Sequence, residues 1–135
     1  MRIQDDQDAR LQKMARRLGR SPSETSALLV EEGLRRSEFA FIEFRDSPVG
    51  RQAYVQGSRL AVWQVVSLAR GYKNSVGETA QHLTWPPIKV QAALKYARAF
   101  PEEIGLAIKD NSSQTFETLS ALLPNLESFG VKKVK

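Results

Sequence analysis

Apolar residues recur at helical spacing near the start of the chain and predict a first helix there. Leu11, Met14 and Leu18 form one stripe, and the stripe stops at Gly19, a residue type that commonly follows a helix end. Ahead of it, the alternating segment Arg2-Ile3-Gln4 fits a short strand whose central residue faces inward.

A second helix is predicted to begin at Ser21. The run Ser21-Pro22-Ser23-Glu24 combines a capping box with proline at the first helical position. Ala27, Val30 and Leu34 follow at helical spacing, so we expect them to form the inner face of this helix.

The pattern changes near residue 38, where we place a domain boundary. Phe39 to Phe44 and Gln52 to Gln56 look extended, which predicts two strands. Between them, Ser47-Pro48-Val49-Gly50 has the residue types of a turn.

Three helices are predicted next, over residues 62–70, 75–83 and 87–100. Ser75-Val76-Gly77-Glu78 is a second capping box, and Trp85-Pro86-Pro87 is a tight connection before the longest of the three. A short helix, a tight turn and a longer helix make a helix-turn-helix outline.

The chain changes character again at Gly105, and residues 109–114 are polar and loop-like. We therefore predict a mainly α fold with minor β structure in three parts. Residues 1–38 form a first domain, residues 39–104 a second domain with a helix-turn-helix-like core of three helices, and residues 105–135 a tail.

The charge of the chain is uneven along its length. The 135 residues include 20 Lys and Arg against 15 Asp and Glu, a net charge of +5. Residues 10–20 hold five cations and no acid. Such a run is either a solvated helix face or a contact for a polyanion. The five cations are Arg10, Lys13, Arg16, Arg17 and Arg20.

The residue types needed for most catalytic and metal sites are scarce. The chain has no cysteine and one histidine, His82, which we expect at the surface or at a helix end. No phosphate-binding glycine loop and no nucleophile–base pair is present, so we expect no enzyme, no metal and no cofactor. The chain shows no long apolar run and no signal peptide, which favours a cytoplasmic protein without membrane association.

Residues 2–36 resemble the ribbon-helix-helix family of bacterial regulators, in which two chains pair their strands and insert the ribbon into the DNA major groove. The resemblance implies a homodimer with Ile3 in its core, and Arg2 and Gln4 pointing outward to read base edges. It also implies a phosphate contact at the helix start, involving Arg20 and the amides of Ser21 to Ser23. The strand offers only two outward polar side chains, so we expect weak specificity per ribbon.

Residues 49–104 resemble the antitoxin family described as domain of unknown function 433. The run Val55 to Trp63 carries the resemblance, with further matches at Ser75 to Thr79 and Pro101 to Ile104. Ser58 stands for the usual threonine and Ala61 for the usual proline. The resemblance implies an antitoxin encoded beside a PIN-like ribonuclease toxin, as in VapBC-type pairs.

An apolar stripe in the tail suits a toxin-binding helix that fits a groove, although it equally suits a helix packed on its own domain. Its residues are Phe116, Leu119, Leu122, Leu123, Leu126 and Phe129. The terminal Lys132, Lys133 and Lys135 are either a plug for an acidic toxin centre or a solvated end.

The sequence thus predicts the antitoxin of a type II toxin–antitoxin system, which binds operator DNA and neutralises a ribonuclease. A stand-alone dimeric transcriptional regulator is the alternative, and an interaction adaptor is a more distant one. We expect Arg59 to bond carbonyls or an acid, and Trp63 and Trp85 to be core or interface residues. Three outward residues of the last long helix either contact DNA or form a dimer contact: Lys89, Gln91 and Lys95.

Overall fold

The structure is a computed structural model that describes residues 4–111. This part of the chain is mainly helical and contains one two-stranded antiparallel sheet, so the predicted fold class is confirmed at that level. The elements are α1 (Asp5–Leu18), α2 (Pro22–Glu38), β1 (Ile42–Ser47), β2 (Gly50–Val55), α3 (Val62–Gly71), α4 (Val76–Leu83), α5 (Pro87–Ala99) and α6 (Pro101–Asp110).

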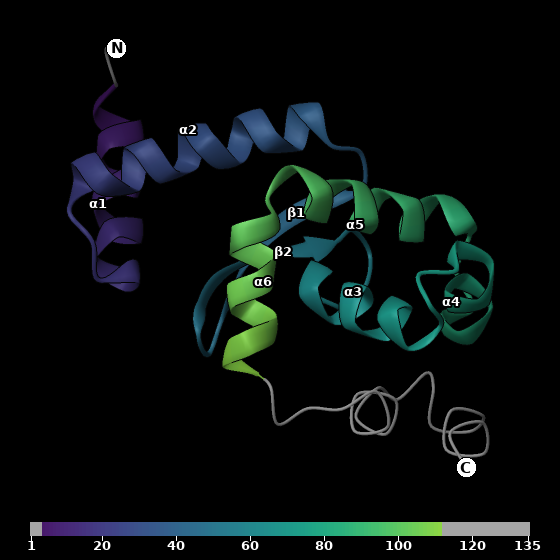
Figure 1. Cartoon of the computed structure of the whole chain (residues 1–135). Helices are drawn as coiled ribbons and strands as arrows, with labels where there is room; N and C mark the ends of the chain where they lie inside the picture. Colours follow the sequence, from purple (N-terminus) through teal and green to yellow (C-terminus); the bar gives the residue numbers. More distant parts are fainter. Residues whose placement is uncertain (1–3, 112–135) are drawn as a thin grey trace.

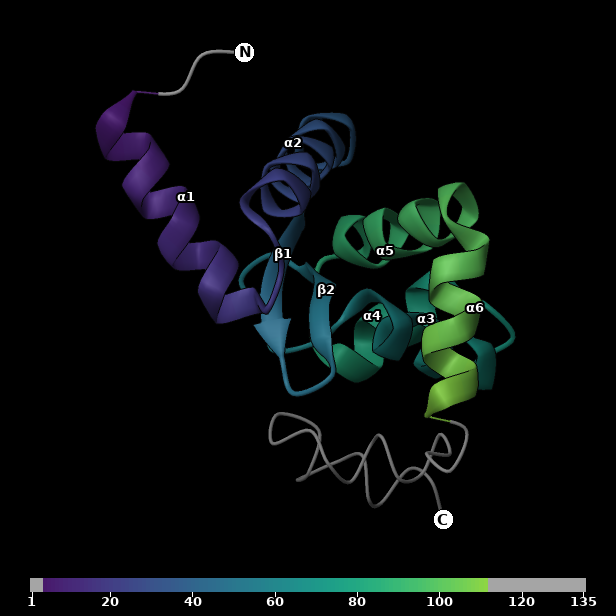
Figure 2. The same cartoon turned by 90° about the vertical axis from the view of Figure 1, so that its left-hand side faces the viewer.

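The hairpin β1–β2 lies between two groups of helices. Figures 1 and 2 show α1 and α2 on one side of the hairpin and α3 to α6 on the other. Helix α2 contacts β1, whereas α3 and α5 contact β2. The two helix groups therefore pack on the same sheet.

A tight turn sets the register of the hairpin. Ser47 pairs with Gly50, and Ile42 pairs with Val55 at the open end. The Ser47 hydroxyl donates to the Gly50 carbonyl at 2.7 Å and accepts from the Val49 amide at 3.3 Å. The predicted strand–turn–strand is confirmed, with each strand within a few residues of its predicted limits.

The main core lies between β2, α3 and α5. It is built from fully buried side chains that include Val55, Val65, Leu68 and Val90. Trp63 is also buried, as expected, and Trp85 packs against the core at its edge. By contrast, the buried residues of α1 and α2 are Ala15, Thr25 and Glu32.

The face of α2 that the apolar pattern predicted as inner is exposed within the chain. Val30 and Leu34 are 50% and 55% exposed, and Ala27 is exposed as well. The buried positions are Thr25 and Glu32, on the opposite side of the helix. The prediction was wrong because periodicity identifies a stripe but not the surface that it faces.

The last two helices also differ from expectation. The predicted helix over 87–100 ends at Ala99, and α6 follows over Pro101–Asp110. The tail boundary at residue 105 therefore falls inside a helix, and Lys109 is helical rather than loop-like. Ile104 is buried in the main core, and this burial keeps α6 helical past Gly105.

His82 lies in the last turn of α4, as expected, but it is buried rather than at the surface. Its Nδ1 lies at hydrogen-bond distance from the Tyr72 hydroxyl, and the two rings pack edge to face with centroids 5.5 Å apart. Burial raises the pKa of Tyr72, with a smaller contribution from Glu78, so the Tyr72 hydroxyl keeps its proton and is available to bond the imidazole.

Candidate functional site

The beginning of the predicted ribbon lies outside the described residues. Arg2 and Ile3 belong to that part. Gln4 is described, and it caps α1 with extended backbone angles. Its side chain is exposed, and its amide donates to the Gln7 side chain at 3.4 Å.

The corner between α1 and α2 has the local structure that its sequence predicts. Gly19 adopts the left-handed conformation at φ 67°, and the next amide, of Arg20, donates to the Ala15 carbonyl at 3.0 Å. The Ser21 hydroxyl accepts from the Glu24 amide at 3.1 Å, and the Glu24 carboxylate accepts from the Ser21 amide at 3.0 Å. The predicted capping box is thus confirmed.

The same capping box corrects the prediction that the amides of Ser21 to Ser23 together bind a phosphate. The Ser21 amide is already bonded to Glu24, and Pro22 has no N–H. Of the three, the Ser23 amide is left in the first turn of α2, where helix amides have no partner within the helix. Hydrogen bonds from Ser21 lower the pKa of Glu24, so an ionised carboxylate stands beside the corner that we expected to receive an anion.

The basic run of α1 divides into paired and unpaired cations. Arg10 pairs with Asp6 at 3.2 Å on the exposed helix surface, and Arg17 pairs with Asp46 at 3.3 Å. The other three form no ion pair with a described residue and are exposed: Lys13, Arg16 and Arg20. Arg16 lies in the last turn of α1 and Arg20 follows that turn at the Ser21–Ser23 corner, so both lie at this end of the helix pair, whereas Lys13 lies in the middle of α1.

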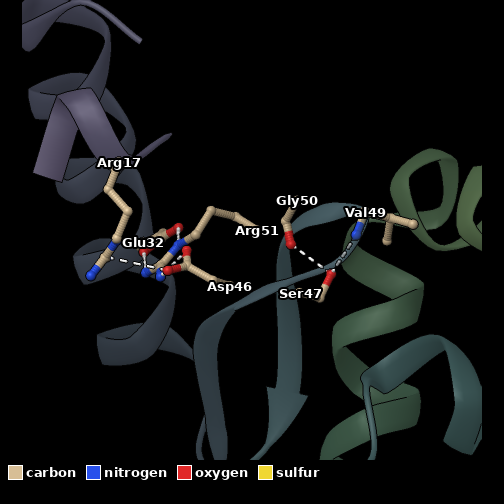
Figure 3. A network of polar contacts seen from close by, with 7 residues as sticks. All are labelled: Arg17, Glu32, Asp46, Ser47, Val49, Gly50 and Arg51. Atoms are coloured by element: carbon tan, nitrogen blue, oxygen red, sulfur yellow. Dashed lines mark hydrogen bonds and ion pairs between the residues drawn. The ribbon is translucent and has the colours of Figure 1, made fainter. Parts of the chain in front are cut away.

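A four-residue ion network braces this end against the hairpin. Figure 3 shows Arg17, Glu32, Asp46 and Arg51 converging from α1, α2, β1 and β2. Arg51 donates two hydrogen bonds to the buried carboxylate of Glu32, at 2.6 and 3.0 Å, and a third to Asp46 at 3.1 Å. The hydrogen bonds to Glu32 are the largest cause that raises the pKa of Arg51. One guanidinium therefore joins α2 to both strands.

A second cluster fixes the other end of α2. Arg35 donates to the Tyr96 hydroxyl and to Glu103, both at 2.7 Å, and its guanidinium lies 3.7 Å from the ring centre of Phe100. Tyr96 in turn donates to Glu103 at 2.7 Å. Burial and then Glu103 raise the pKa of Tyr96, so its hydroxyl stays a donor. This cluster joins α2 to α5 and α6.

Sequence reasoning missed both clusters. Arg35 lies in the last turn of α2, where the helix dipole favours a cation whatever its other partners are. The one local signal was an acidic residue at position 32 of a helix with an apolar stripe, and such a residue needs a cation if it is buried. The partners lie 19 residues away for Glu32 and 68 for Arg35, and no spacing rule predicts them.

The remaining predicted contacts are only partly supported. Gln91 and Lys95 are exposed on α5, whereas Lys89 is half-buried and donates to the Gln56 carbonyl at 3.3 Å. Arg59 is exposed, and it bonds no carbonyl or acid among the described residues. The bond to a carbonyl of this loop comes from Arg45, which donates to Ser58 at 2.6 Å, so the role predicted for Arg59 was wrong.

The predicted toxin-binding residues, Phe116 to Phe129, lie outside the described residues, as do the terminal lysines. Within residues 4–111, no group of three His, Asp or Glu side chains is placed to hold a metal ion. In the same range, no helix is long and apolar enough to cross a membrane. Comparison with protein-family models, with curated proteins and with solved structures found no match.

Proposed function

We propose that this chain is a dimeric, non-catalytic DNA-binding protein of the cytoplasm that represses its own operon and neutralises a PIN-like ribonuclease toxin. The observation that carries the DNA-binding part is the exposed corner at residues 19–23 with unpaired cations beside it on α1. Cations that are not neutralised within the protein are available to phosphates.

The exposed face of α2 supports the dimer. Val30 and Leu34 are large apolar side chains, one helical turn apart, that the chain leaves in contact with solvent, and neighbouring exposed apolar side chains favour association. The ion network holds the opposite side of α2 against the hairpin, so the apolar face is directed away from its own chain. A twofold pairing of α2 helices would cover this face.

The ribbon and the helix-turn-helix roles are finer parts of the same proposal. Pairing of the segments Arg2 to Gln4 from two chains would complete a ribbon next to the paired α2 helices. The helices α4 and α5 are joined through Thr84, which adopts the left-handed conformation at φ 59°. This turn supports a helix-turn-helix-like arrangement in the second domain.

The toxin-binding part of the proposal rests on the sequence resemblance of residues 49–104 and on the apolar stripe of Phe116 to Phe129. The stripe follows α6, which ends at Asp110. A helix-in-groove contact with the toxin is the recognition mode that such a stripe favours.

DNA binding can be tested with the DNA upstream of the gene as probe. Arg20→Ala is expected to weaken binding to all sequences alike and to reduce the salt dependence, because it removes a phosphate contact. Arg2→Ala is expected instead to relax sequence preference, by about 1–3 kcal/mol per lost base contact. Binding that does not respond to salt would contradict the DNA-binding role.

Toxin binding separates the antitoxin from a stand-alone regulator. The neighbouring gene product should co-purify with the full chain, and its ribonuclease activity should be inhibited at a stoichiometric ratio. A chain that binds its operator but leaves every neighbouring product unbound would be a stand-alone dimeric transcriptional regulator.

A further inference from the structure

Two adjoining hollows flank the connection between α2 and β1. One has a volume of about 500 Å³ and lies against α5, and the other has a volume of about 290 Å³ and lies against the end of α2. Phe39 and Phe41 line both hollows. We call the two together the connection groove.

The wall of the larger hollow is mostly apolar. Its side chains come from the connection, from the start of α4 and from α5, and Ile88 is 54% exposed there. Open apolar grooves of this kind accept apolar side chains from a partner. The apolar residues that matter here are Phe41, Val76, Ile88, Ala92 and Leu94.

The charged residues that line the connection groove are all basic. Arg36, Lys95 and Arg98 line it, and none of the three forms an ion pair with a described residue. No acidic residue lines either hollow. The hollows beside α6 and beside α2 differ, because Glu103 lines both of them. The connection groove is thus complementary to a negatively charged partner.

Phe41 stands at the centre of this groove in a strained conformation. Its φ is 63°, in the left-handed region that bulky residues avoid. Its carbonyl accepts a hydrogen bond from the Gln56 amide at 2.7 Å, which holds the backbone in place. Strain of this kind is often retained where a side chain must be presented at a binding site.

We propose that the connection groove binds a helical protein segment that has apolar side chains along one face and acidic side chains beside them. The apolar side chains would fill the hollow along α5, and the acids would meet Lys95 and Arg98 at its edge. The two aromatic residues of the groove, Phe39 and Phe41, are half-buried, and Ile88, Ala92 and Leu94 add an aliphatic lining. This lining favours a peptide over a nucleic acid, because bases stack on exposed aromatic rings. None of its lining residues belongs to the Arg20 corner.

The test uses the full chain and a fluorescent synthetic helix of about 14 residues, with leucines at i, i+3, i+4 and i+7 and glutamates beside them. A second peptide carries lysine at every glutamate position. The acidic peptide should bind the wild-type chain, and Lys95→Glu with Arg98→Glu should weaken it about tenfold or more. Arg70→Glu with Lys109→Glu makes the same charge change outside the groove and should leave binding unchanged.

Ala92→Phe provides a second variant, which fills the groove without changing its charge. It should weaken the acidic peptide while leaving the circular dichroism spectrum and operator binding intact. Equal binding of both peptides, no effect of Ala92→Phe, or a single-stranded oligonucleotide that competes at the groove would overturn the proposal. Arg20→Ala should not affect peptide binding, so failure of the DNA-binding role and failure of this groove are distinguishable.

Discussion

Glu32 is buried on a helix whose large apolar side chains are exposed, which inverts the usual arrangement of a helix on a core. Glu32 is 6% exposed, and Arg51 compensates its carboxylate through two hydrogen bonds. A buried ion pair is weak evidence for stability, but breaking it leaves a charge without a partner. Because Glu32 faces the hairpin with a cation as its partner, the polar side of α2 is buried and its apolar side is exposed, the opposite of what the apolar periodicity predicted.

Arg51→Met should destabilise the chain strongly, because Glu32 would stay buried without its cation. We expect a loss of about 2–4 kcal/mol in the free energy of unfolding, measured by urea denaturation. The control is Arg70→Met, an exposed arginine at the end of α3, which should change stability by about 0.5 kcal/mol or less. Similar losses in both variants would show that the network does not stabilise the fold.

Glu24→Gln should strengthen DNA binding several-fold if the corner contacts phosphate. The lowered pKa keeps the Glu24 carboxylate ionised at pH values below its ordinary titration range. Its stabilising effect on α2 is therefore present at neutral pH and is lost as the pH falls through the lowered pKa. The substitution removes a negative charge beside Arg20, and fluorescence anisotropy with operator DNA reads the effect. Glu38→Gln removes the same charge at the far end of α2 and should leave the affinity unchanged.

At the element scale, the sequence predicted helix starts where a capping residue determines them locally. The starts of α2 and α4 follow from Ser21 and Ser75, whose hydroxyls accept from amides three residues ahead. The start of α6 has a different local signal, because Pro101 stands at its first position and Glu102 and Glu103 follow in its first turn. It was missed because Gly105 was taken as the beginning of a tail, whereas burial of Ile104 stabilises the helix through it.

Val30→Lys together with Leu34→Lys should convert the proposed dimer into a monomer without unfolding the chain. Both residues are at least half exposed within one chain, so the substitutions remove little buried surface from the monomer. Sedimentation velocity measures the change, and Leu106→Lys, on the exposed face of α6, is the matched control. A wild-type chain that sediments as a monomer at the same concentration would contradict the role of this face.

At the scale of the whole molecule, most of the buried apolar surface belongs to the hairpin and the helices after it. The helix pair α1–α2 depends on contacts distant in sequence, such as Glu32 with Arg51 and Arg35 with Glu103. Those pairings depend on the docking of α2 on the hairpin, which no local pattern encodes. The sequence therefore predicted the corner at Ser21, but not the contacts of α2 with the hairpin and with α6 that hold this corner in place.

Residues 39–111 should fold as a separate fragment, because they contain nearly all of the main core. A fragment of residues 1–38 buries little by itself and should gain helix only as its concentration rises and it pairs. Circular dichroism over a concentration series measures both. A fully helical 1–38 fragment at the lowest concentration would contradict this expectation.

Phe100 ends α5 and begins α6, so one residue joins two helices that both contribute to the core. An extra residue there would rotate α6 by about 100° about its axis and turn Ile104 away from the core. The turn tip at Pro48 and Val49 is exposed, and an extra residue there would only lengthen a loop. Changes of chain length over evolution should therefore accumulate at the hairpin tip and be purged at Phe100, and a single-residue insertion scan scored by soluble yield would reveal that contrast.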